Sequence, residues 1–414
     1  MASKYQAPRG TFDVLPEQAR SRRRLERTAA EVFGRAGYEP IGTPIFEDTD
    51  LFERGVGQST DIVRKEMFTF EDKGGRSLTL RPEGTASICR AYLQHGMQKL
   101  AQPVKLFYLG PFFRHERPQA GRYRQFHQLG AECIGTDSPL ADAEAIMLLS
   151  DLLGEMGVPG VELRLGSLGS FEARRAYLED LKAHLHAHET DLPKDVRERI
   201  DLNPLRAFDS DDEGTRGVMA SAPTIVGRLE GEDAADFEEV RALLDAAGIA
   251  YAVDPTLVRG LDYYTRTIFS FVCDQLGAQS EIGGGGRYDG LIEQLGGPPT
   301  PAVGFAAGIE RILLALDEAE PAAGRDAFVA VTGPDQLHRA MAIATELRRA
   351  GISTELDLAG RGLKGQLKHA NRIGARRVLI LEADGGAQLR DMGSGEQGPA
   401  DPGNLVEEMK GGQE

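Results

Sequence analysis

Apolar residues recur at helical spacing in some segments of the chain and in alternation in others, a pattern typical of a mixed fold. The segment from Pro16 to about Gly37 predicts an amphipathic helix, because its apolar residues fall on one side and proline suits a first helical turn. These apolar residues are Leu25, Ala29, Val32, Phe33 and Ala36. The next segment, 38–48, predicts an extended chain at a sheet edge or an interface, because Pro40 and Pro44 cannot donate ladder hydrogen bonds.

The segment from Lys105 to Gly135 predicts two strands joined by an irregular basic loop that contains Pro118 and Gly121. Side chains of a strand alternate between faces, so three residues of each strand share a face. These residues are Phe112, Arg114 and Glu116 in the first strand, and Phe126, Gln128 and Glu132 in the second. If the strands pair antiparallel, one surface carries charges, an amide and an aromatic ring, as a recognition surface would. Taken alone, an ordinary hairpin with these residues in solvent fits equally well.

Residues 77–96 predict a strand that passes into a helix, and residues 142–157 predict a second helix. Glu83 and Thr85 open the first of these helices. They fit two roles, which are capping of the helix N-terminus and presentation of a carboxylate and a hydroxyl to a ligand amine.

From about residue 171 to 248 the chain has a helical and strongly charged pattern, which predicts an inserted helical module. It contains His184, His186 and His188. On a helix only the first and third of these share a face, and no third ligand has an obvious spacing, so a metal site is not favoured. The acidic cluster 209–213 lacks the periodic ligands of a calcium loop and predicts a solvated turn.

Strand character returns at residues 257–274 and continues into a glycine run at 283–286. The run is weak evidence for phosphate binding, because neither nucleotide-binding glycine fingerprint is present, and it fits equally a close approach of two backbones. In the segment GFAAGIER a glycine-rich strand enters a helix that has Arg311 in its first turns. A cation there opposes the helix dipole, so it needs an anion, either a nearby carboxylate such as Glu310 or a ligand phosphate.

After a linker at residues 317–327, the pattern reads strand, helix, strand, helix, strand, strand, which predicts a small α/β domain. In its second helix Lys364, Lys368 and Arg372 recur every four residues. The surrounding segment 361–377 has no acidic residue, so it predicts a basic patch.

The 414 residues, 41% hydrophobic and 27% charged, allow two or three globular domains. The chain has no apolar run of bilayer length and no apolar stretch of a secretory signal at its start, so we expect a cytoplasmic protein. Cys89, Cys133 and Cys273 form no C-x-x-C pair and are expected to be reduced and buried. The net charge of −16 opposes an anionic partner unless a basic surface is segregated from the acidic ones, as the 361–377 patch would be.

Together these segments resemble the class II aminoacyl-tRNA synthetases over nearly the whole chain. TPIFED is similar to the first family signature, at a dimer interface, YLGPFFRHERPQAGRYRQFHQLGAE to the second, and GFAAGIER to the third. LRPEGT, LVRGLDYYTRTIFSF and GGGGRYDGL resemble segments of the histidine-specific members, the histidyl-tRNA synthetases.

The resemblance implies an α+β fold, with a class II synthetase-type antiparallel sheet and flanking helices. The catalytic domain would span residues 1–322, with the helical insertion at about 171–248, and an α/β anticodon-binding domain would span 326–414. The implied activity is histidine–tRNA ligation by a homodimer, with ATP, L-histidine and tRNA(His) as substrates, Mg²⁺ accompanying ATP, and no metal held by the protein itself.

The resemblance also implies roles for individual residues. For ATP they are Arg114 at the α-phosphate, Glu116 at the adenine edge, Phe126 stacked on the ring, and Arg122 and Arg311 at the outer phosphates. For histidine they are Glu83, Thr85 and Gln128 at the amino group and Glu132 and Tyr264 at the imidazole, with Gly84 and Tyr263 beside them. Arg259 would approach the α-phosphate and the histidine carboxylate and would be catalytic, as would Arg114 and Arg311. For tRNA they are Arg117 and Gln119 at the acceptor end, and Lys364, Lys368 and Arg372 at the anticodon arm.

Two alternatives belong to other classes of protein. One is a non-catalytic regulatory paralogue that senses histidine and partners an ATP phosphoribosyltransferase. Arg114, Arg259, Arg311 and the C-terminal α/β domain speak against it. The other is a purely RNA-binding module, which leaves the histidine-type pocket residues without a role.

Overall fold

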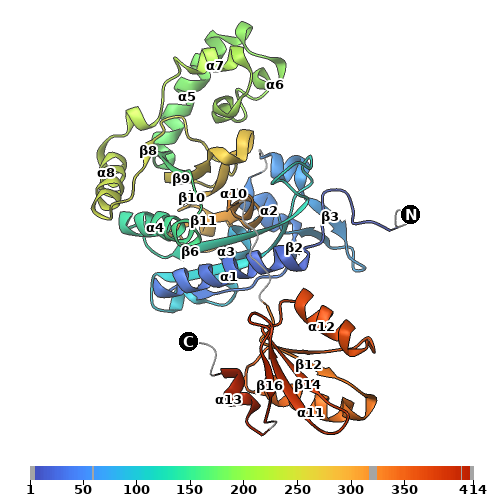
Figure 1. Cartoon of the computed structure of the whole chain (residues 1–414). Coiled ribbons are helices and arrows are strands. Elements are labelled where there is room, and N and C mark those ends of the chain that lie inside the picture. Colours follow the sequence, from blue (N-terminus) through green and yellow to red (C-terminus); the bar gives the residue numbers. More distant parts are fainter. Residues whose placement is uncertain (1–4, 58–59, 317–323, 402, 411–414) are drawn as a thin grey trace. The chain divides into compact units, whose positions relative to one another are not determined.

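The structure is a computed structural model that describes residues 5–57, 60–316, 324–401 and 403–410. The chain divides into two compact units, Met1–Glu320 and Pro321–Glu414, which the colours of Figure 1 separate. In the described part of the chain, the search for a helix long and apolar enough to cross a membrane found none. Cys89, Cys133 and Cys273 are free and buried, as predicted.

The first unit is built on a mostly antiparallel sheet with the strand order β1-β5-β6-β11-β10-β9-β7-β8. The strands are β1 (Glu39–Pro40), β5 (Val104–Phe113), β6 (Gln125–Ile134), β7 (Val161–Ser167), β8 (Ala252–Val253), β9 (Thr265–Cys273), β10 (Glu281–Arg287) and β11 (Ala302–Gly308). The two outer pairs, β1 with β5 and β7 with β8, are parallel. The segment with Pro40 thus forms an edge strand, as predicted.

The β5–β6 hairpin pairs antiparallel, which confirms the prediction, with Phe112 opposite Phe126 and Gly110 opposite Gln128. The prediction that Arg114 and Glu116 continue the first strand is wrong. The N–H of Arg114 still bonds to Arg124 across the hairpin, but the next N–H, that of His115, donates to Glu66 at 2.7 Å. The chain therefore leaves the sheet at Phe113, and both charged residues lie in the connecting loop.

Alternation along these strands divides the core between the two faces of the sheet. Phe107, Leu129 and Ala131 pack with α1 (Pro16–Arg35), α4 (Pro139–Met156), α8 (Gly231–Ala246) and α10 (Ile309–Leu316). On the other face Leu106 and Tyr108 pack with α3 (Thr85–Gln94) and α5 (Phe171–Ala187). Gln128 and Glu132 fall by period two on this second face, so the polar face of β6 points toward α3.

A second, three-stranded sheet of the first unit has the order β2-β4-β3, from β2 (Phe46–Asp48), β3 (Phe68–Glu71) and β4 (Ser77–Leu80). The helix α2 (Thr49–Val56), the π-helix η1 (Ile62–Glu66), the 3-10 helix η2 (Met97–Lys99) and α9 (Leu291–Gln294) complete the first unit outside the helical module, together with the 3-10 helix η6 (Asp274–Gln279).

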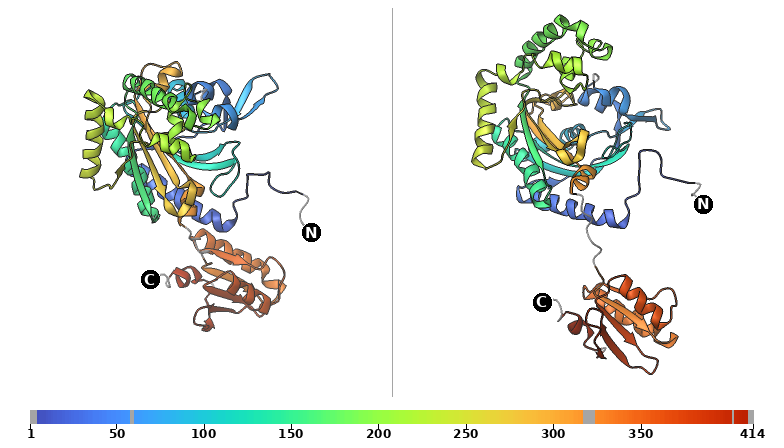
Figure 2. Two further views of the ribbon diagram at one scale, coloured as in Figure 1. Left: turned by 90° about the horizontal axis from the view of Figure 1, so that it is seen from above. Right: turned by 45° about the horizontal axis from the view of Figure 1, so that its top comes forward.

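The segment 171–248 is built of helices, seen as the green and yellow group in Figures 1 and 2. We call it the helical module. After α5 come η3 (Glu189–Asp191), α6 (Lys194–Arg197), η4 (Pro204–Asp209), α7 (Glu213–Met219), η5 (Val226–Arg228) and α8. His184 and His188 bond to the main-chain oxygens of Val218 and His184 at 3.0 and 2.9 Å. Among the described residues no group of three or more His, Cys, Asp or Glu is placed to hold a metal.

The second unit has a five-stranded sheet with the order β13-β12-β14-β15-β16. Its elements are β12 (Ala327–Val331), η7 (Pro334–Gln336), α11 (Leu337–Arg349), β13 (Thr354–Leu356), α12 (Leu363–Arg372), β14 (Arg377–Leu381), β15 (Ala387–Asp391), β16 (Gln397–Pro399) and α13 (Leu405–Lys410). The predicted succession of strands and helices is confirmed. Two short elements, β16 and α13, were not predicted, because three and six residues carry no readable period.

Candidate active site

A cavity of about 610 Å³ lies in the first unit, over the sheet face that carries Gln128. Most of the residues predicted for ATP and histidine line it. They are Glu83, Gly84, Thr85, Arg114, Glu116, Arg122, Phe126, Gln128, Arg259, Tyr263, Tyr264 and Arg311. These residues come from α3, the β5–β6 hairpin, the segment before β9 and the start of α10, so segments far apart in sequence converge here.

One part of the cavity wall combines cations with an aromatic ring. The Arg114 guanidinium lies 5.3 Å from the centre of the Phe126 ring, and its Nε donates to the Pro82 carbonyl at 2.9 Å. Glu116 lies between two arginines, 3.8 Å from Arg114 and 3.5 Å from Arg122. This part of the wall, formed by Phe126 of β6 and the β5–β6 loop, therefore presents a flat apolar surface next to positive charge, which suits a nucleotide base and its phosphates.

Arg311 adds a further cation to this wall. Its Nε donates to the Gly121 carbonyl at 3.2 Å, and its Nη1 donates to the main-chain oxygen of Glu281. Glu310 is not its partner, because that carboxylate accepts the His127 N–H at 2.9 Å and lies 2.8 Å from His127 Nδ1. Burial lowers the pKa of Arg311, and nearby Glu281 offsets this only in part. Glu310 is therefore not the anion that faces Arg311, whereas the carboxylate of Glu281 lies near its guanidinium.

Arg259 forms an ion pair with Glu281, a residue that the sequence did not single out. Arg259 Nη1 lies 2.6 Å from Glu281 Oε1, and 13% of the arginine side chain is exposed. Burial lowers the pKa of Arg259, but Glu281 outweighs this and the net shift is upward. Burial raises the pKa of Glu281, but Arg259 and then Arg311 outweigh it, so the net shift is downward. Both groups are therefore charged at neutral pH.

The glycine run explains how Arg259 can lie against the sheet. A Cβ at Gly284 would be 2.9 Å from Arg259 Nη1 and 2.4 Å from the Phe269 carbonyl. A Cβ at Gly285 would be 2.0 Å from the Gly304 carbonyl. These are closer than any side chain tolerates, which supports the view that the run serves close approach of backbones.

At the opposite wall Glu83 caps helix α3. Its carboxylate accepts the N–H groups of Thr85 at 2.7 Å and Ala86 at 2.9 Å. Burial raises the pKa of Glu83 although these two bonds lower it. The Tyr263 hydroxyl lies 3.5 Å from the same carboxylate. Both roles considered for Glu83 fit this geometry, since the capping carboxylate also lines the cavity.

Glu132 lies behind the cavity wall and is completely buried. Its two oxygens accept from the Thr85 hydroxyl at 2.8 Å and the Tyr288 hydroxyl at 2.5 Å. The two hydrogen bonds lower the pKa of Glu132, but burial raises it by more, to about 8. Gly304 makes room for the carboxylate, because a Cβ there would be 1.8 Å from Glu132 Oε2. Tyr288 was not identified beforehand, although it belongs to the GGGGRYDGL segment.

Three buried polar atoms at the cavity have no hydrogen-bond partner among the described residues. They are Tyr108 OH, Gln128 Oε1 and Arg259 Nε. Buried polar groups are almost always paired, so these atoms indicate partners that a ligand supplies. Tyr108 was not among the predicted site residues, because in the sequence it reads as one more apolar position of β5.

The helical module also contributes to the cavity wall through Arg206 and Asp209. Asp209 ends η4 and lies 3.1 Å from Arg206. Burial raises the pKa of Asp209, and the Arg206 guanidinium opposes this. The prediction of a solvated cluster at 209–213 is confirmed for both residues, because 47% of the Asp209 side chain is exposed and the Asp211 side chain is fully exposed.

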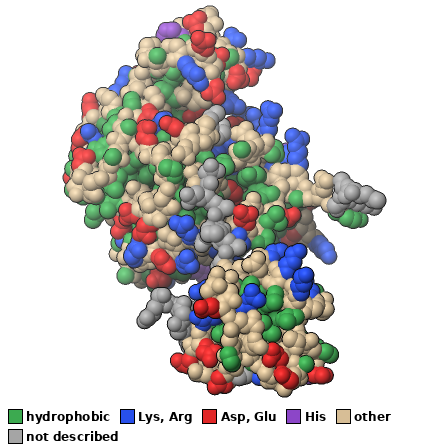
Figure 3. Space-filling model, in the orientation of Figure 1, with side chains coloured by type: hydrophobic (Ala, Val, Ile, Leu, Met, Phe, Trp, Pro, Cys, Tyr) green, Lys and Arg blue, Asp and Glu red, His purple; other side chains and the backbone are tan. Residues whose placement is uncertain are grey.

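The residues predicted for tRNA lie outside this cavity. Arg117 and Gln119 are exposed in the β5–β6 loop. In the second unit Lys364, Lys368 and Arg372 are exposed on α12, whose opposite side buries Gln366 and Ala370. Figure 3 shows blue Lys and Arg side chains gathered on the part of this unit where Figure 1 places α12.

The chain matches the family model of histidyl-tRNA synthetase over residues 10–312 and that of the anticodon binding domain over residues 326–411. A histidine–tRNA ligase of Rubrobacter xylanophilus is 48% identical over 95% of this chain and 96% of its own. A histidine–tRNA ligase of Halothermothrix orenii is 48% identical over 98% of both chains.

Among solved structures, apo S. aureus histidyl-tRNA synthetase is 37% identical, with a TM-score of 0.83 over 98% of this chain and 100% of its own. A structure from Bacillus halodurans C, described as an ATP phosphoribosyltransferase regulatory subunit/histidyl-tRNA synthetase, is 23% identical with a TM-score of 0.68 over 92% of this chain and 100% of its own, and shows only a shared fold. The family model over residues 10–312 and the relatives of high identity and coverage show that the chain belongs to the histidyl-tRNA synthetase family.

Proposed function

We propose that this protein is a histidine–tRNA ligase. It activates L-histidine with ATP to histidyl-adenylate and pyrophosphate, and then transfers histidine to the 3′ end of tRNA(His) with release of AMP. The observation that carries this proposal is a single cavity that joins a cationic, aromatic wall to a polar wall with buried unpaired atoms. The first wall suits a nucleoside triphosphate, and the second suits a small polar amino acid.

On the nucleotide side Phe126 stacks on the adenine and Glu116 meets its edge. Arg114 and Arg259 hold the α-phosphate, while Arg122 and Arg311 hold the outer phosphates. The ion pair between Arg259 and Glu281 keeps the guanidinium at the cavity wall at a 2.6 Å contact before a ligand arrives. Arg259 Nε has no partner among the described residues, so it is available to the α-phosphate or to the histidine carboxylate.

On the amino-acid side Glu83, Thr85 and Gln128 receive the α-amino group, which supplies the donor that the buried Gln128 Oε1 lacks. Tyr264 meets the imidazole. Glu132 does not line the cavity wall, so it acts indirectly, by holding the hydroxyl groups of Thr85 and Tyr288 through hydrogen bonds. A site of such fixed polar groups rejects side chains that leave them unpaired.

The first reaction step needs positioning and charge rather than a general base, because the histidine carboxylate is already ionised at neutral pH. It attacks the α-phosphate, and pyrophosphate leaves with the bonding electron pair. Four arginines around the phosphates compensate the charge that develops at phosphorus and on the leaving group.

Mg²⁺ fits this site as an ion carried by ATP. It is usually held by one or two carboxylates together with phosphate oxygens, and Glu281 is a carboxylate at the cavity wall, beside Arg259 and Arg311. When bound, it supplies positive charge to the phosphates.

Dimer formation is supported by an exposed apolar surface in and beside the TPIFED segment. Ile45, Phe46 and Phe70 are exposed by 44%, 47% and 44%, and the rings of Phe46 and Phe70 lie 6.3 Å apart. A contiguous apolar surface of this kind is typical of an interface. We propose that a second copy of the chain covers it. Catalysis in the cytoplasm follows from the same function.

Histidine-dependent exchange of pyrophosphate into ATP tests the function. The purified protein with Mg²⁺ and histidine should exchange, and should not exchange with other amino acids. Absence of exchange would defeat the ligase proposal and favour the regulatory paralogue.

A further inference from the structure

The segment Leu257–Tyr264, which we call the substrate loop, has no regular secondary structure, yet it carries three of the cavity residues that are predicted to contact the substrates. These are Arg259, Tyr263 and Tyr264. A loop without its own ladder of hydrogen bonds must be fixed from outside if its side chains are to hold a geometry suited to catalysis. This support comes from hydrogen bonds to the main-chain carbonyl groups of the loop.

Alternate carbonyl groups of the substrate loop accept hydrogen bonds from arginines of the helical module. Arg206 Nη2 in η4 donates to the Gly260 carbonyl at 2.9 Å. Arg174 Nη1 in α5 donates to the Tyr264 carbonyl at 2.9 Å and to that of Asp262 at 3.4 Å. Asn203 Nδ2 adds a 3.3 Å bond to the Asp262 side chain. The module thus contacts the loop at three successive alternate residues.

The other side of the substrate loop rests on the end of helix α2. The Asp262 N–H donates to the Val56 carbonyl at 3.4 Å. Gly57 has a φ of 102°, and a Cβ there would lie 2.6 Å from Asp262 Oδ2. The loop therefore lies between the helical module on one side and α2 on the other.

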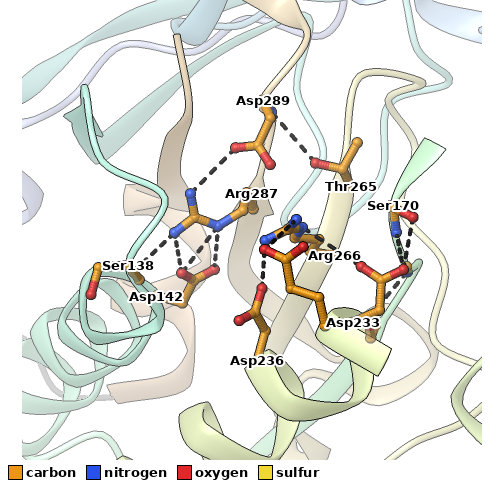
Figure 4. A network of polar contacts seen from close by, with 12 residues as sticks. Ser138, Asp142, Ser170, Asp233, Asp236, Thr265, Arg266, Arg287 and Asp289 are labelled. Carbon is orange, nitrogen blue, oxygen red and sulfur yellow. Dashed lines mark hydrogen bonds and ion pairs between the residues drawn. The ribbon is translucent and has the colours of Figure 1, made fainter. Parts of the chain in front are cut away.

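Arg266, just after the loop, fixes the base of the same module. It ion-pairs with Asp233 at 3.6 Å and with Asp236, both on α8, and Asp233 in turn accepts from the Ser170 hydroxyl at 2.7 Å, as Figure 4 shows. The Arg266 N–H donates to the Gly169 carbonyl at 2.8 Å. Both ends of the module are therefore joined to the strand that follows the substrate loop.

The guanidinium of Arg174 is partly removed from water. Burial lowers the pKa of its guanidinium, and nearby Asp262 opposes this. Among the described residues no carboxylate lies within ion-pair distance of it, and both of its hydrogen bonds go to loop carbonyls. A half-buried guanidinium whose Nη1 donates to two carbonyl groups of one irregular segment acts on the geometry of that segment.

We propose that Arg174 and Arg206 are positioning residues that fix the main chain of the substrate loop, so that the helical module sets how well histidine is bound and activated. The inference rests on the proposed ligase function, and it concerns the first reaction step, before tRNA takes part.

The test compares the full-length wild type with Arg174→Ala, Arg174→Lys and Arg206→Ala. Arg175→Ala is the matched control, because Arg175 is the next residue of the same helix and is exposed. Pyrophosphate exchange gives kcat and the KM values for histidine and ATP. Arg174→Ala should lower kcat/KM for histidine about 10- to 100-fold while the KM for ATP stays within about twofold. Arg206→Ala should lower it less, and the lysine variant should recover part of the loss.

Limited trypsin digestion gives a second measurement that does not depend on activity. Trypsin cuts after arginine, so a released loop should be cut faster between Arg259 and Gly260 in Arg174→Ala than in wild type and control, as mass spectrometry would map.

Equal cleavage and equal kinetics in Arg174→Ala and Arg175→Ala would overturn the inference. If the alanine variant fails to fold by circular dichroism, control-like values in both Arg174→Lys and Arg206→Ala would overturn it. Lack of exchange in the wild type would refute the ligase function, while faster loop cleavage would still support the positioning role.

Discussion

Two acidic groups at or near the cavity have opposite protonation states, and their surroundings explain why. Glu281 faces two guanidinium groups, so its pKa is lowered. Glu132 faces only hydroxyl donors, so burial dominates and raises its pKa to about 8. At neutral pH Glu281 is therefore an anion that can hold Arg259, while Glu132 is mostly a neutral acid that orders Thr85 and Tyr288 without adding charge beneath the amino-acid site.

The raised pKa of Glu132 predicts a pH-dependent stability. The folded state binds a proton up to pH about 8, whereas the unfolded carboxyl releases it near 4.5. Below pH 4.5 the carboxyl is protonated in both states, so Glu132 does not change the free energy of unfolding with pH. As the pH rises from 4.5 toward 8, the unfolded state loses its proton first, and the free energy of unfolding falls. Glu132→Gln removes this titration. Relative to wild type, the variant should gain roughly 3–5 kcal/mol of unfolding free energy between pH 4.5 and 8.

Urea unfolding of the wild type and Glu132→Gln at pH 5 and pH 8 measures this difference. Glu172→Gln is a suitable control, because Glu172 is exposed on α5 and its difference from wild type should not change with pH. A Glu132→Gln difference that is equal at both pH values would show that the buried carboxyl titrates normally.

Arg259 gives a second prediction at the residue scale. Arg259→His replaces a permanent bidentate cation by a shorter and mostly neutral group at pH 7.5. The exchange rate should fall by two or more orders of magnitude, on the order of 3 kcal/mol in the barrier, while the circular dichroism spectrum is unchanged. Arg175→His is the control on an exposed arginine. An exchange rate equal to that of the control would remove Arg259 from the mechanism.

At the scale of elements, strand β10 shows why a strand can be made of glycines. It lies between β9 and β11, and Gly285 pairs with Phe305 on one side and Phe269 on the other. Glycine weakens a strand through its conformational freedom, but here the neighbouring backbones and the Arg259 side chain occupy the space of a Cβ. The glycines thus lower the intrinsic stability of β10, but they allow the neighbouring strands and the Arg259 side chain to pack directly against its backbone.

This predicts a different outcome for two Gly→Ala substitutions. Gly285→Ala would place a Cβ 2.0 Å from the Gly304 carbonyl, so it should destabilise the first unit by about 2 kcal/mol or more. Gly34→Ala meets no atom within 4 Å in helix α1 and should be neutral or stabilising by up to about 1 kcal/mol. The denaturation midpoints of the two variants test this, and we expect a lower midpoint for Gly285→Ala than for Gly34→Ala. Equal midpoints would mean that β10 can shift to accept a side chain.

Periodicity predicted most of the elements because their buried faces are regular, as in α1 with Leu25, Val32 and Phe33. It failed at Arg114 and Glu116, where the alternation of charges resembles a strand but the chain has already turned to bond with Glu66. Local pattern contains no information about such a distant hydrogen-bond partner.

Arg311 stands out in the sequence because it is a cation in the first turns of a helix that follows a glycine-rich strand, whereas Arg259 was predicted only from the family resemblance. Glu281 and Tyr288 were missed because their importance comes from pairing across the fold. Glu281 becomes a site residue only when it contacts Arg259, and Tyr288 lies 156 residues from the carboxyl that it contacts. Arg174 was read as part of a charged helix for the same reason.

At the scale of the whole molecule, a net charge of −16 must be reconciled with an RNA substrate. Screening limits the repulsive field to about 8 Å at physiological salt, so exposed cations on one helix can still attract phosphates. Several cations of the 361–377 segment already have acidic or main-chain partners, as Arg361 has in Asp357 and Arg376 has in Asp326. We therefore propose that the attraction comes chiefly from Lys364, Lys368 and Arg372 on α12.

Lys368→Glu should weaken tRNA binding without affecting histidine activation, because the two processes use different units of the chain. We expect the KM for tRNA(His) in aminoacylation to rise about tenfold, and the logarithmic salt dependence of binding to lose about one unit of slope. Pyrophosphate exchange without tRNA should match wild type. Arg349→Glu is the matched control, since it makes the same change of charge at an exposed position of α11 in the same unit. If both variants raise the KM equally, the overall charge of the unit determines binding and the face of α12 has no special role.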